Sequence, residues 1–193
     1  YNQLIPAVIS DDQFICFNTS PDTLNITQLS TGGGILDTSS YTWQTSSDGL
    51  NWQFFSNGIQ FLPINLISNK FYRVKTISDF NCGPVYSNEV LITVYEDLLS
   101  GEIMNSDNIC YNTIPDLLSF TNPPSGADGN YTFNWQLSLN ASLWDSIPLT
   151  DSLFFQPPIL DNTHFYRVIV DSDFGCGTLI TNTIMYSICL CYS

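Results

Sequence analysis

The sequence is poor in cationic side chains. It holds 4 Lys and Arg against 18 Asp and Glu, which gives a formal net charge of −14. Nucleic acids and anionic membrane surfaces attract proteins through clusters of Lys and Arg that neutralise phosphate groups. We therefore expect neither of them among the partners of this protein, and the acidic excess favours a secreted or surface-exposed protein.

Alanine and long apolar runs are scarce as well. Only Ala7, Ala127 and Ala141 occur in 193 residues, whereas Thr, Ile, Val, Tyr and Phe are abundant. Alanine favours helices and β-branched or aromatic side chains favour strands, so the composition predicts an all-β protein. No apolar run reaches the roughly 18 residues that span a bilayer, and Tyr1 begins without a basic and then apolar signal segment. We expect no membrane insertion, and a mature fragment of a longer protein.

One phrase occurs twice in the chain. "KFYRVKTISDFNCG" at 70–83 returns as "HFYRVIVDSDFGCG" at 164–177, 94 positions later. The same offset relates Cys16 to Cys110, Cys82 to Cys176 and Asn88 to Asn182, while Trp43 and Trp52 match Trp135 and Trp144 at an offset of 92. A period near 94 is too long for a solenoid unit and fits one small β-sandwich. We therefore predict two tandem domains, residues 1–96 and 97–193.

Short alternating segments separated by turn residues fill each copy. "YTWQTSSDGLNWQFF" at 41–55 places two such segments around Asp48-Gly49, a dipeptide that favours tight hairpins. This pattern predicts that Trp43 and Trp52 lie on paired strands, and that Trp43 and its counterpart Trp135 pack in the core.

The repeated "FYRV" segment also alternates. Alternation places Tyr72 and Val74 on one face of a strand and leaves Arg73 on the other, where it is available for cation–π contacts or ion pairing. With about seven short strands per copy, the pattern predicts two tandem immunoglobulin-like β-sandwich domains.

The cysteines repeat with the domains. Cys16 and Cys82 are 66 positions apart, and so are Cys110 and Cys176. A pair that recurs at fixed spacing in each copy favours one disulfide within each domain. Metal ligation is the alternative, and it has less support because the chain has no C-x-x-C and a single histidine, His164.

Cys189 and Cys191 have no counterparts in the first copy. If the closing strand continues through them, they lie on one face with Cα atoms about 6.6 Å apart. That separation is at the outer limit for a disulfide. We predict that at least one of them pairs with a following domain or with another chain, which would make this end a covalent junction. Two free thiols are the alternative.

The order "ICxN…L…YtWQxSsDGxNW…FYRV…C…SNxVxItV" is present from about Leu4 to Tyr95 and again from about Leu98 to Cys189. It resembles the immunoglobulin-like repeats of very large cell-surface adhesins of Bacteroidota, including gliding-motility adhesins. The second copy departs from the pattern with "LSLNASLW" in place of the Asp-Gly hairpin. The resemblance implies a stalk or display module of a protein exported by the type IX system. Its expected partners are neighbouring repeats, surface polysaccharide or other chains of a filament.

The resemblance also implies modification. Proteins exported in this phylum carry O-glycans at Asp-Ser or Asp-Thr followed by an apolar residue. Thr23, Ser146 and Ser152 lie in such triplets, "DTL", "DSI" and "DSL". We therefore predict a glycoprotein modified at these three positions.

The sequence favours a protein that is not an enzyme. The first copy has Lys70 in place of His164, so no acid–base pair that uses histidine is common to both copies. Cysteine nucleophiles are excluded if the cysteines are paired. We expect no cofactor and no metal. Ca²⁺ at the acidic clusters Asp11-Asp12 and Asp171-Ser172-Asp173 is a weaker alternative, because acidic loop residues are usually solvated.

A carbohydrate- or protein-binding module is the alternative function. Exposed aromatic rings on a sandwich face can stack on sugars. Trp52 and Trp144, beside Arg73 and Arg167, are the candidates for ligand contact. From the sequence, a stalk at the cell surface is the favoured function, and the binding module stays open.

Overall fold

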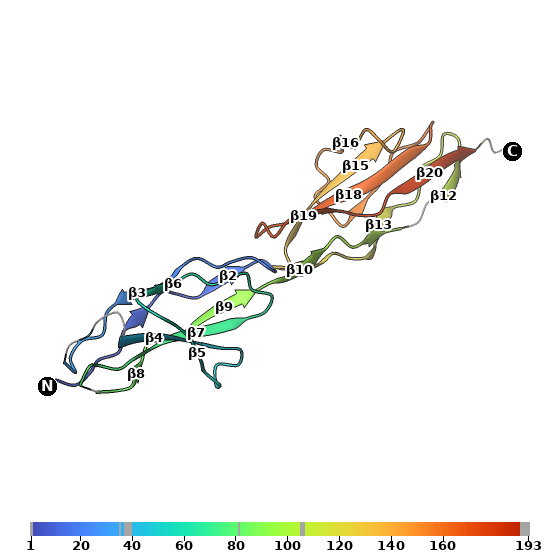
Figure 1. Cartoon of the computed structure of the whole chain (residues 1–193). Helices are drawn as coiled ribbons and strands as arrows, with labels where there is room; N and C mark the ends of the chain where they lie inside the picture. The colour runs from blue at the N-terminus through green and yellow to red at the C-terminus, as the bar shows by residue number, and fades with distance from the viewer. Residues whose placement is uncertain (1, 35, 37–39, 81, 105–106, 190–193) are drawn as a thin grey trace. The chain divides into compact units, whose positions relative to one another are not determined.

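The computed structural model describes residues 2–34, 36, 40–80, 82–104 and 107–189. As the composition predicts, these residues form strands and loops and contain no α-helix. The chain divides into two compact units, unit 1 (Tyr1–Tyr95) and unit 2 (Glu96–Ser193). Only Tyr95 stands between the last strand of unit 1 and the first strand of unit 2 (Figure 1).

Unit 1 forms two sheets from its described residues. One sheet has the order β1-β3-β6, and the other has the order β2-β9-β7-β4-β5 with β8 paired to β7. The strands are β1 (Val8–Ile9), β2 (Gln13–Ile15), β3 (Leu24–Gln28), β4 (Tyr41–Ser46), β5 (Gln53–Asn57), β6 (Gln60–Phe61), β7 (Lys70–Thr76), β8 (Val85–Tyr86) and β9 (Val90–Val94). Strand β2 runs parallel to β9, and the other pairs are antiparallel.

Unit 2 repeats this arrangement. Its larger sheet has the order β12-β20-β18-β15-β16 with β19 paired to β18, and β11-β13-β17 forms the second sheet. A further pair, β10 with β14, lies where the unit begins. The strands are β10 (Glu96–Leu99), β11 (Glu102–Ile103), β12 (Asp107–Cys110), β13 (Leu118–Asn122), β14 (Ser125–Ala127), β15 (Tyr131–Ser138), β16 (Asp145–Ser146), β17 (Phe154–Phe155), β18 (His164–Ser172), β19 (Thr178–Ile180) and β20 (Ile184–Cys189). The matching strand orders confirm the repeat predicted from the sequence offsets.

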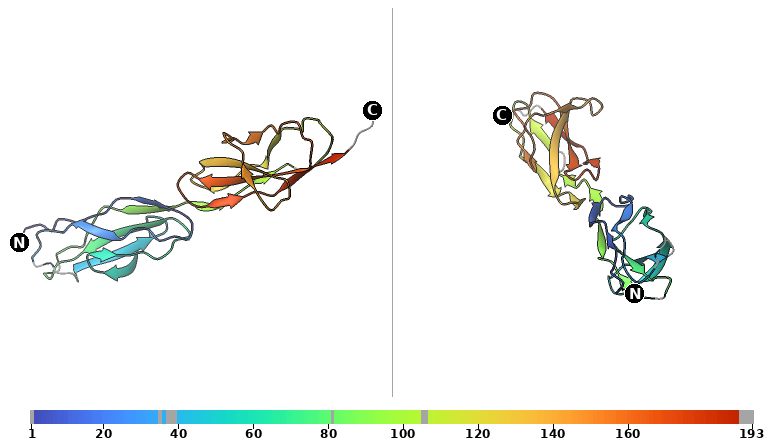
Figure 2. Two further views of the ribbon diagram at one scale, coloured as in Figure 1. Left: turned by 90° about the horizontal axis from the view of Figure 1, so that it is seen from above. Right: turned by 90° about the vertical axis from the view of Figure 1, so that its left-hand side faces the viewer.

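The chain enters each unit at one end and leaves it at the opposite end. Within each unit the long strands run from end to end (Figures 1 and 2). We call the end where the chain begins the amino pole and the end where the last strand leaves the carboxyl pole. At the amino pole of unit 1, the Gly33 amide donates to Asn2 O at 2.9 Å. At its carboxyl pole, the Tyr95 amide donates to Ile15 O at 2.9 Å.

The core of each unit is built around one tryptophan. The side chains of Trp43 and Trp135 are 0% exposed, which confirms the prediction that they pack in the core. The Trp43 indole Nε1 donates to Gly58 O at 3.0 Å, and Trp135 Nε1 donates to Ser152 O at 2.9 Å. Aromatic rings surround both indoles, with Phe61 at 6.3 Å from Trp43 between ring centroids.

The alternation predicted in "FYRV" is confirmed. Tyr72 and Val74 on β7 are 2% and 0% exposed, whereas Phe71 and Arg73 face outward and are partly exposed. Trp43 on β4 lies opposite Val74 in the antiparallel register, so the two side chains share the inner face of the sheet.

The tight hairpin predicted at Asp48-Gly49 is wrong in its length. Strand β4 ends at Ser46 and β5 begins at Gln53, so a six-residue loop, 47–52, joins them. Trp52 therefore lies in this loop and not on a strand paired with that of Trp43. The loop is longer because side-chain hydrogen bonds, described below, close it in place of a two-residue turn.

Replacement of the core tryptophan should weaken unit 1 strongly. We expect Trp43→Ala to lower its free energy of unfolding by about 3–5 kcal/mol, the usual range for a buried large aromatic residue. The control Leu50→Ala, at a side chain that is 82% exposed, should change it by less than about 0.5 kcal/mol. Hydrogen exchange read by mass spectrometry measures the two units separately. Equal losses for both variants would contradict the assignment of Trp43 to the core.

Candidate functional site

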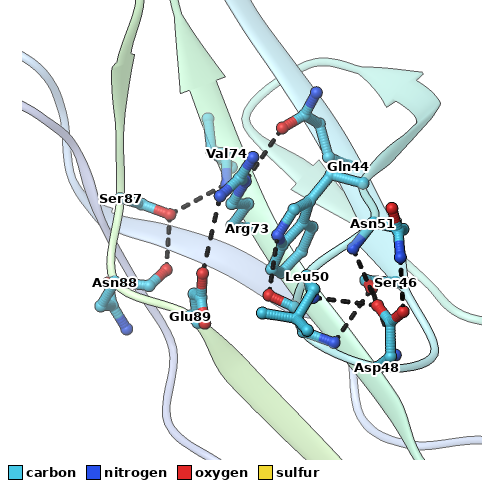
Figure 3. Close-up of polar contacts among 12 residues, drawn as sticks. Gln44, Ser46, Asp48, Leu50, Asn51, Arg73, Val74, Ser87, Asn88 and Glu89 are labelled. Atoms are coloured by element: carbon cyan, nitrogen blue, oxygen red, sulfur yellow. Dashed lines mark hydrogen bonds and ion pairs between the residues drawn. The ribbon is translucent and has the colours of Figure 1, made fainter.

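Arg73 contacts several side chains on the outer face of unit 1. Its guanidinium carbon lies 4.0 Å from the ring centroid of Trp52 and 4.2 Å from that of Tyr86. Its Nε donates to Gln44 Oε1 at 3.0 Å, and one terminal nitrogen lies 3.6 Å from Glu89 Oε1 (Figure 3). We call these five residues the arginine clamp.

Strand pairing positions Gln44, Arg73 and Tyr86 of the arginine clamp. Gln44 lies opposite Arg73 in the β4–β7 register, so both side chains stand on the outer face. The next strand, β8, places Tyr86 opposite Lys75. The Val74 amide donates to Ser87 Oγ at 2.9 Å, and this bond holds the segment after Tyr86 against β7 (Figure 3).

The loop between β4 and β5 positions the other ring of the clamp, that of Trp52. Asp48 Oδ1 accepts hydrogen bonds from the Leu50 amide at 2.9 Å, the Asn51 amide at 2.8 Å and Ser46 Oγ at 2.8 Å (Figure 3). The Trp52 indole then donates to Gly49 O at 3.1 Å. The closed loop thereby holds the indole against the guanidinium.

Hydrogen bonds to its carboxylate lower the pKa of Asp48 well below its ordinary value. The Asn51 amide is the largest cause, followed by the Asn51 side chain, the Leu50 amide and Ser46 Oγ. Each of these donors favours the ionised carboxylate, so protonation of Asp48 would weaken the hydrogen bonds that close the loop.

Unit 2 builds the same loop with different residues. Asn140 Oδ1 accepts from the Ser142 and Leu143 amides, both at 2.9 Å, as Asp48 does in unit 1. Ala141 takes the place of Gly49 and adopts a φ of 56°, in the left-handed region where glycine has a φ of 71° in unit 1. The departure "LSLNASLW" therefore preserves the loop geometry.

The corresponding cluster in unit 2, around Arg167, contains fewer residues. The Arg167 guanidinium carbon lies 4.1 Å from the Trp144 ring centroid, and its Nε donates to Gln136 Oε1 at 2.7 Å. The positions 94 residues after Tyr86 and Glu89 are Ile180 and Thr183, which offer neither a second ring nor a carboxylate.

The two tryptophans predicted to contact a ligand are partners of arginine. Each is half-buried and has a guanidinium over its ring, and the Trp52 N–H is bonded within its own loop. A sugar stacking on the same face of the ring would have to displace Arg73 or Arg167. The arrangement holds the loop on the sheet, and it leaves Tyr86, 41% exposed, at the edge of the cluster.

The predicted disulfide between Cys16 and Cys82 is wrong. Cys82 is a free thiol, whereas Cys16 is disulfide-bonded. Cys16 follows β2 at the carboxyl pole, and Cys82 lies beyond the opposite end of β7, in the turn to β8. The seven residues of β7 span about 20 Å, three times the Cα separation that a disulfide allows.

The predicted disulfide between Cys110 and Cys176 is wrong for the same reason. Both are disulfide-bonded, but Cys110 ends β12 opposite Cys189, and Cys176 lies in the β18–β19 turn. The nine residues of β18 separate these positions by about 26 Å. Cys189 Sγ lies 3.3 Å from Ile109 O, and Cys191 lies outside the described residues, so the pairing of these junction cysteines stays a prediction.

The remaining candidate residues are dispersed. Ser146 is exposed on β16, and Thr23 and Ser152 are partly exposed, so modification at these three positions stays a prediction. Asp12 Oδ1 accepts from the Leu91 amide at 2.7 Å, and Asp171 accepts from Thr178 Oγ1. In the part of the chain that the structure describes, no three His, Cys, Asp or Glu side chains gather as metal ligands, and no helix could span a membrane.

A family model described as "Domain of unknown function (DUF8696)" matches residues 5–96 and, a second time, residues 99–188. No curated protein matches the sequence. Among solved structures, domains A168–A170 of titin are similar over 95% of this chain and 65% of theirs, with 14% identity and a TM-score of 0.50. Immunoglobulin domains 1–4 of Sidekick-1 cover 97% of this chain and 48% of theirs, with 12% identity and a TM-score of 0.48. This chain thus spans less than two thirds of either structure. Its fold is an immunoglobulin-like β-sandwich that is present twice.

Arg73 contacts a second ring and an ion-pair partner, so it should contribute more to the stability of unit 1 than Arg167 contributes to the stability of unit 2. We expect Arg73→Ala to cost unit 1 about 1 kcal/mol more than Arg167→Ala costs unit 2, because partly exposed cation–π contacts contribute about 0.5–1 kcal/mol and an exposed ion pair less. Arg73→Lys should recover little, since an ammonium group lacks the planar face and the Nε donor. Hydrogen exchange in each unit provides the measurement, and equal costs at the two arginines would refute the difference.

The lowered pKa of Asp48 predicts a pH dependence in unit 1. The ionised carboxylate stabilises the fold above the ordinary Asp pKa of about 3.8, and this contribution is lost as the pH falls below about 4 toward the folded value. Asp48→Asn should flatten the loss of stability of unit 1 below pH 4, because Asn140 serves the same loop of unit 2 without a charge. Acid unfolding followed by hydrogen exchange is the measurement. An unchanged acid profile in the variant would show that Asp48 does not contribute.

Proposed function

Because the chain consists of two consecutive copies of the domain described as DUF8696 and belongs to that family, we propose that it is a stalk or display segment of a secreted cell-surface adhesin. It gives spacing and mechanical continuity in adhesion or gliding and catalyses no reaction. Its nearest partners are neighbouring repeats of the same chain.

The observation that carries this proposal is the path of the chain through each unit. Unit 1 begins at the pole where Asn2 meets Gly33 and ends at the opposite pole, where Tyr95 meets Ile15. Only Tyr95 separates the end of β9 from the start of unit 2. A repeat whose two termini lie at opposite poles adds length to an array with each copy, whereas a repeat with adjacent termini would not.

Cysteine chemistry and charge support a location outside the cell. Cys16, Cys110 and Cys176 are disulfide-bonded, and such bonds persist in oxidising compartments. The formal net charge of −14 opposes close association between copies of the chain. We infer an extracellular, surface-attached protein, as in the adhesins that its motif order resembles.

The two carboxylates with a lowered pKa support a role without catalysis. Asp48 is held by its own loop, and the pKa of Asp128 is lowered chiefly by the Asn130 side chain and also by Ser172. Both carboxylates close turns of the main chain. Their hydrogen bonds stabilise the ionised form and so make them poor proton donors near neutral pH.

A glycan array separates a stalk from a binding module. We expect wild-type chain to give no more signal than the Trp52→Ala and Trp144→Ala variants on arrays of bacterial surface polysaccharides, because the ring faces already contact arginine. A known lectin on the same slides controls for ligand presentation. Saturable binding by wild type that either substitution abolishes would overturn the stalk proposal and establish the binding module.

A further inference from the structure

We propose that unit 1 carries a binding site for a small hydroxylated carboxylate, in a polar cavity where the β4–β5 loop meets the first residue of β7. The cavity has a volume of about 150 Å³ and is lined by Thr45, Ser46, Ser47, Asn51, Gln53 and Lys70. All six residues belong to unit 1. The site goes beyond the proposed function, because a stalk or display segment does not require it.

Strand register places three of the lining residues on the inner face of the larger sheet. Lys70 lies two residues before the buried Tyr72 on β7, and so shares its face. Thr45 on β4 lies opposite Tyr72, and Gln53 on β5 lies opposite Thr45. Beyond Tyr72 the inner face of the sheet therefore changes from apolar core residues to polar side chains.

The β4–β5 loop forms the other wall of the cavity. Ser46 and Asn51 are fixed by bonds within this loop, and Ser47 lies between them in the sequence. Ser46 Oγ accepts from the Gly49 amide at 3.0 Å. Asn51 Nδ2 donates to Asp48 Oδ2 at 2.7 Å (Figure 3). Because the protein itself closes the loop, this wall is formed before any ligand binds.

Three polar groups of the lining are available to a ligand. They are the Ser47 hydroxyl, the Gln53 amide and the Lys70 ammonium. In the part of the chain that the structure describes, none of these side-chain groups forms a hydrogen bond or an ion pair. Lys70 is nevertheless partly buried, so its charge has lost part of its hydration. An anionic ligand would restore an interaction to this ammonium.

Charge decides the class of ligand. Lys70 is the one charged residue of the lining, so the cavity attracts an anion and repels a metal cation. The acidic residue of the loop, Asp48, does not line the cavity, and its two oxygens accept bonds within the loop. An apolar ligand would leave the three available polar groups without partners, at a cost in binding free energy.

The remaining polar atoms favour a carboxylate that also carries hydroxyl groups. A carboxylate accepts hydrogen bonds from an ammonium, an amide and a hydroxyl, which are the donors of Lys70, Gln53 and Ser47. Thr45 Oγ1 donates its own hydrogen to Phe71 O at 3.2 Å, so it and Gln53 Oε1 are acceptors for ligand hydroxyls. The volume lies below the roughly 300–1,000 Å³ of sites for larger molecules. A sugar acid fits these requirements, either free or as one unit of an acidic polysaccharide.

Unit 2 does not repeat this lining. At the positions of Thr45, Ser47 and Asn51 it has leucines, namely Leu137, Leu139 and Leu143. Asp145 replaces Gln53 and adds a negative charge. His164 replaces Lys70, and its Nδ1 lies 2.8 Å from Asn162 O. Unit 2 therefore should not bind the ligand, and it provides an internal control.

An NMR titration of the whole chain with D-galacturonate tests the site without any variant. We expect saturable shifts of the backbone amides of residues 45–53 and 70, and none at the matched residues 137–145 and 164. Neutral D-galactose and the methyl ester of galacturonate keep the hydroxyls and lack the negative charge, so they should not shift these amides. Equal shifts with the neutral sugars, or no saturable shifts at 45–53 and 70, would overturn the proposal.

Two lysine variants separate the cavity from the general charge of the protein. Lys70→Gln should weaken galacturonate binding by about tenfold or more, because it removes a charge-assisted hydrogen bond. The control Lys75→Gln removes the same charge from β7 at a residue that does not line the cavity, and should change the affinity by less than about twofold. An affinity that Lys70→Gln leaves unchanged, or equal losses in both variants, would contradict the site.

Tetragalacturonate identifies the source of the ligand. Binding about tenfold tighter than that of the monomer, with shifts at further residues of unit 1, assigns the site to an acidic polysaccharide, whereas equal affinity assigns it to a free sugar acid. Both results support the site. Trp52 does not line the cavity, so an array signal that depends on Trp52 would overturn the stalk proposal and leave this one intact. The two proposals therefore fail separately.

Discussion

The indole of Trp43 fills the space between the two sheets of unit 1, and its ring N–H must find an acceptor there. A buried donor left without a partner costs about 1–3 kcal/mol. Gly58 O provides the acceptor at 3.0 Å, which ties the connection between β5 and β6 to the core. With Val74 opposite Trp43 on the same face, alternation along β7 then forces Arg73 outward. The position of the clamp thus depends on the buried tryptophan.

An arginine turned outward from a sheet could remain fully solvated, yet both units stack it under a tryptophan. The loop that delivers the tryptophan depends on one side-chain oxygen that accepts two successive backbone amides. Asp48 supplies that oxygen in unit 1 and Asn140 supplies it in unit 2. The geometry requires an acceptor at this position and does not require a charge, which explains how the two repeats differ in sequence and share a loop.

Periodicity predicted the strands and the inward faces of Tyr72 and Val74, because alternation depends on residues near one another in the chain. The offset of 94 positions predicted the repeat. The loop at Asp48 was predicted too short, since the Asp-Gly signal does not show that a side chain will close a longer connection. The cysteine pairing failed for a different reason. A pair of cysteines that recurs with every repeat is equally regular in the sequence whether or not the two are bonded to each other. Only the structure shows that the two cysteines of a repeat lie at opposite ends of β7 or of β18.

The parallel pairing of β2 with β9 also sets how unit 1 would respond to a pull on its two ends. Gln13, Phe14 and Ile15 lie opposite Ile92, Thr93 and Val94, so the first and last parts of the unit run side by side in the same direction. A pull on the two ends would therefore load the evenly spaced hydrogen bonds of this pair together, in shear, and would not break them one after another.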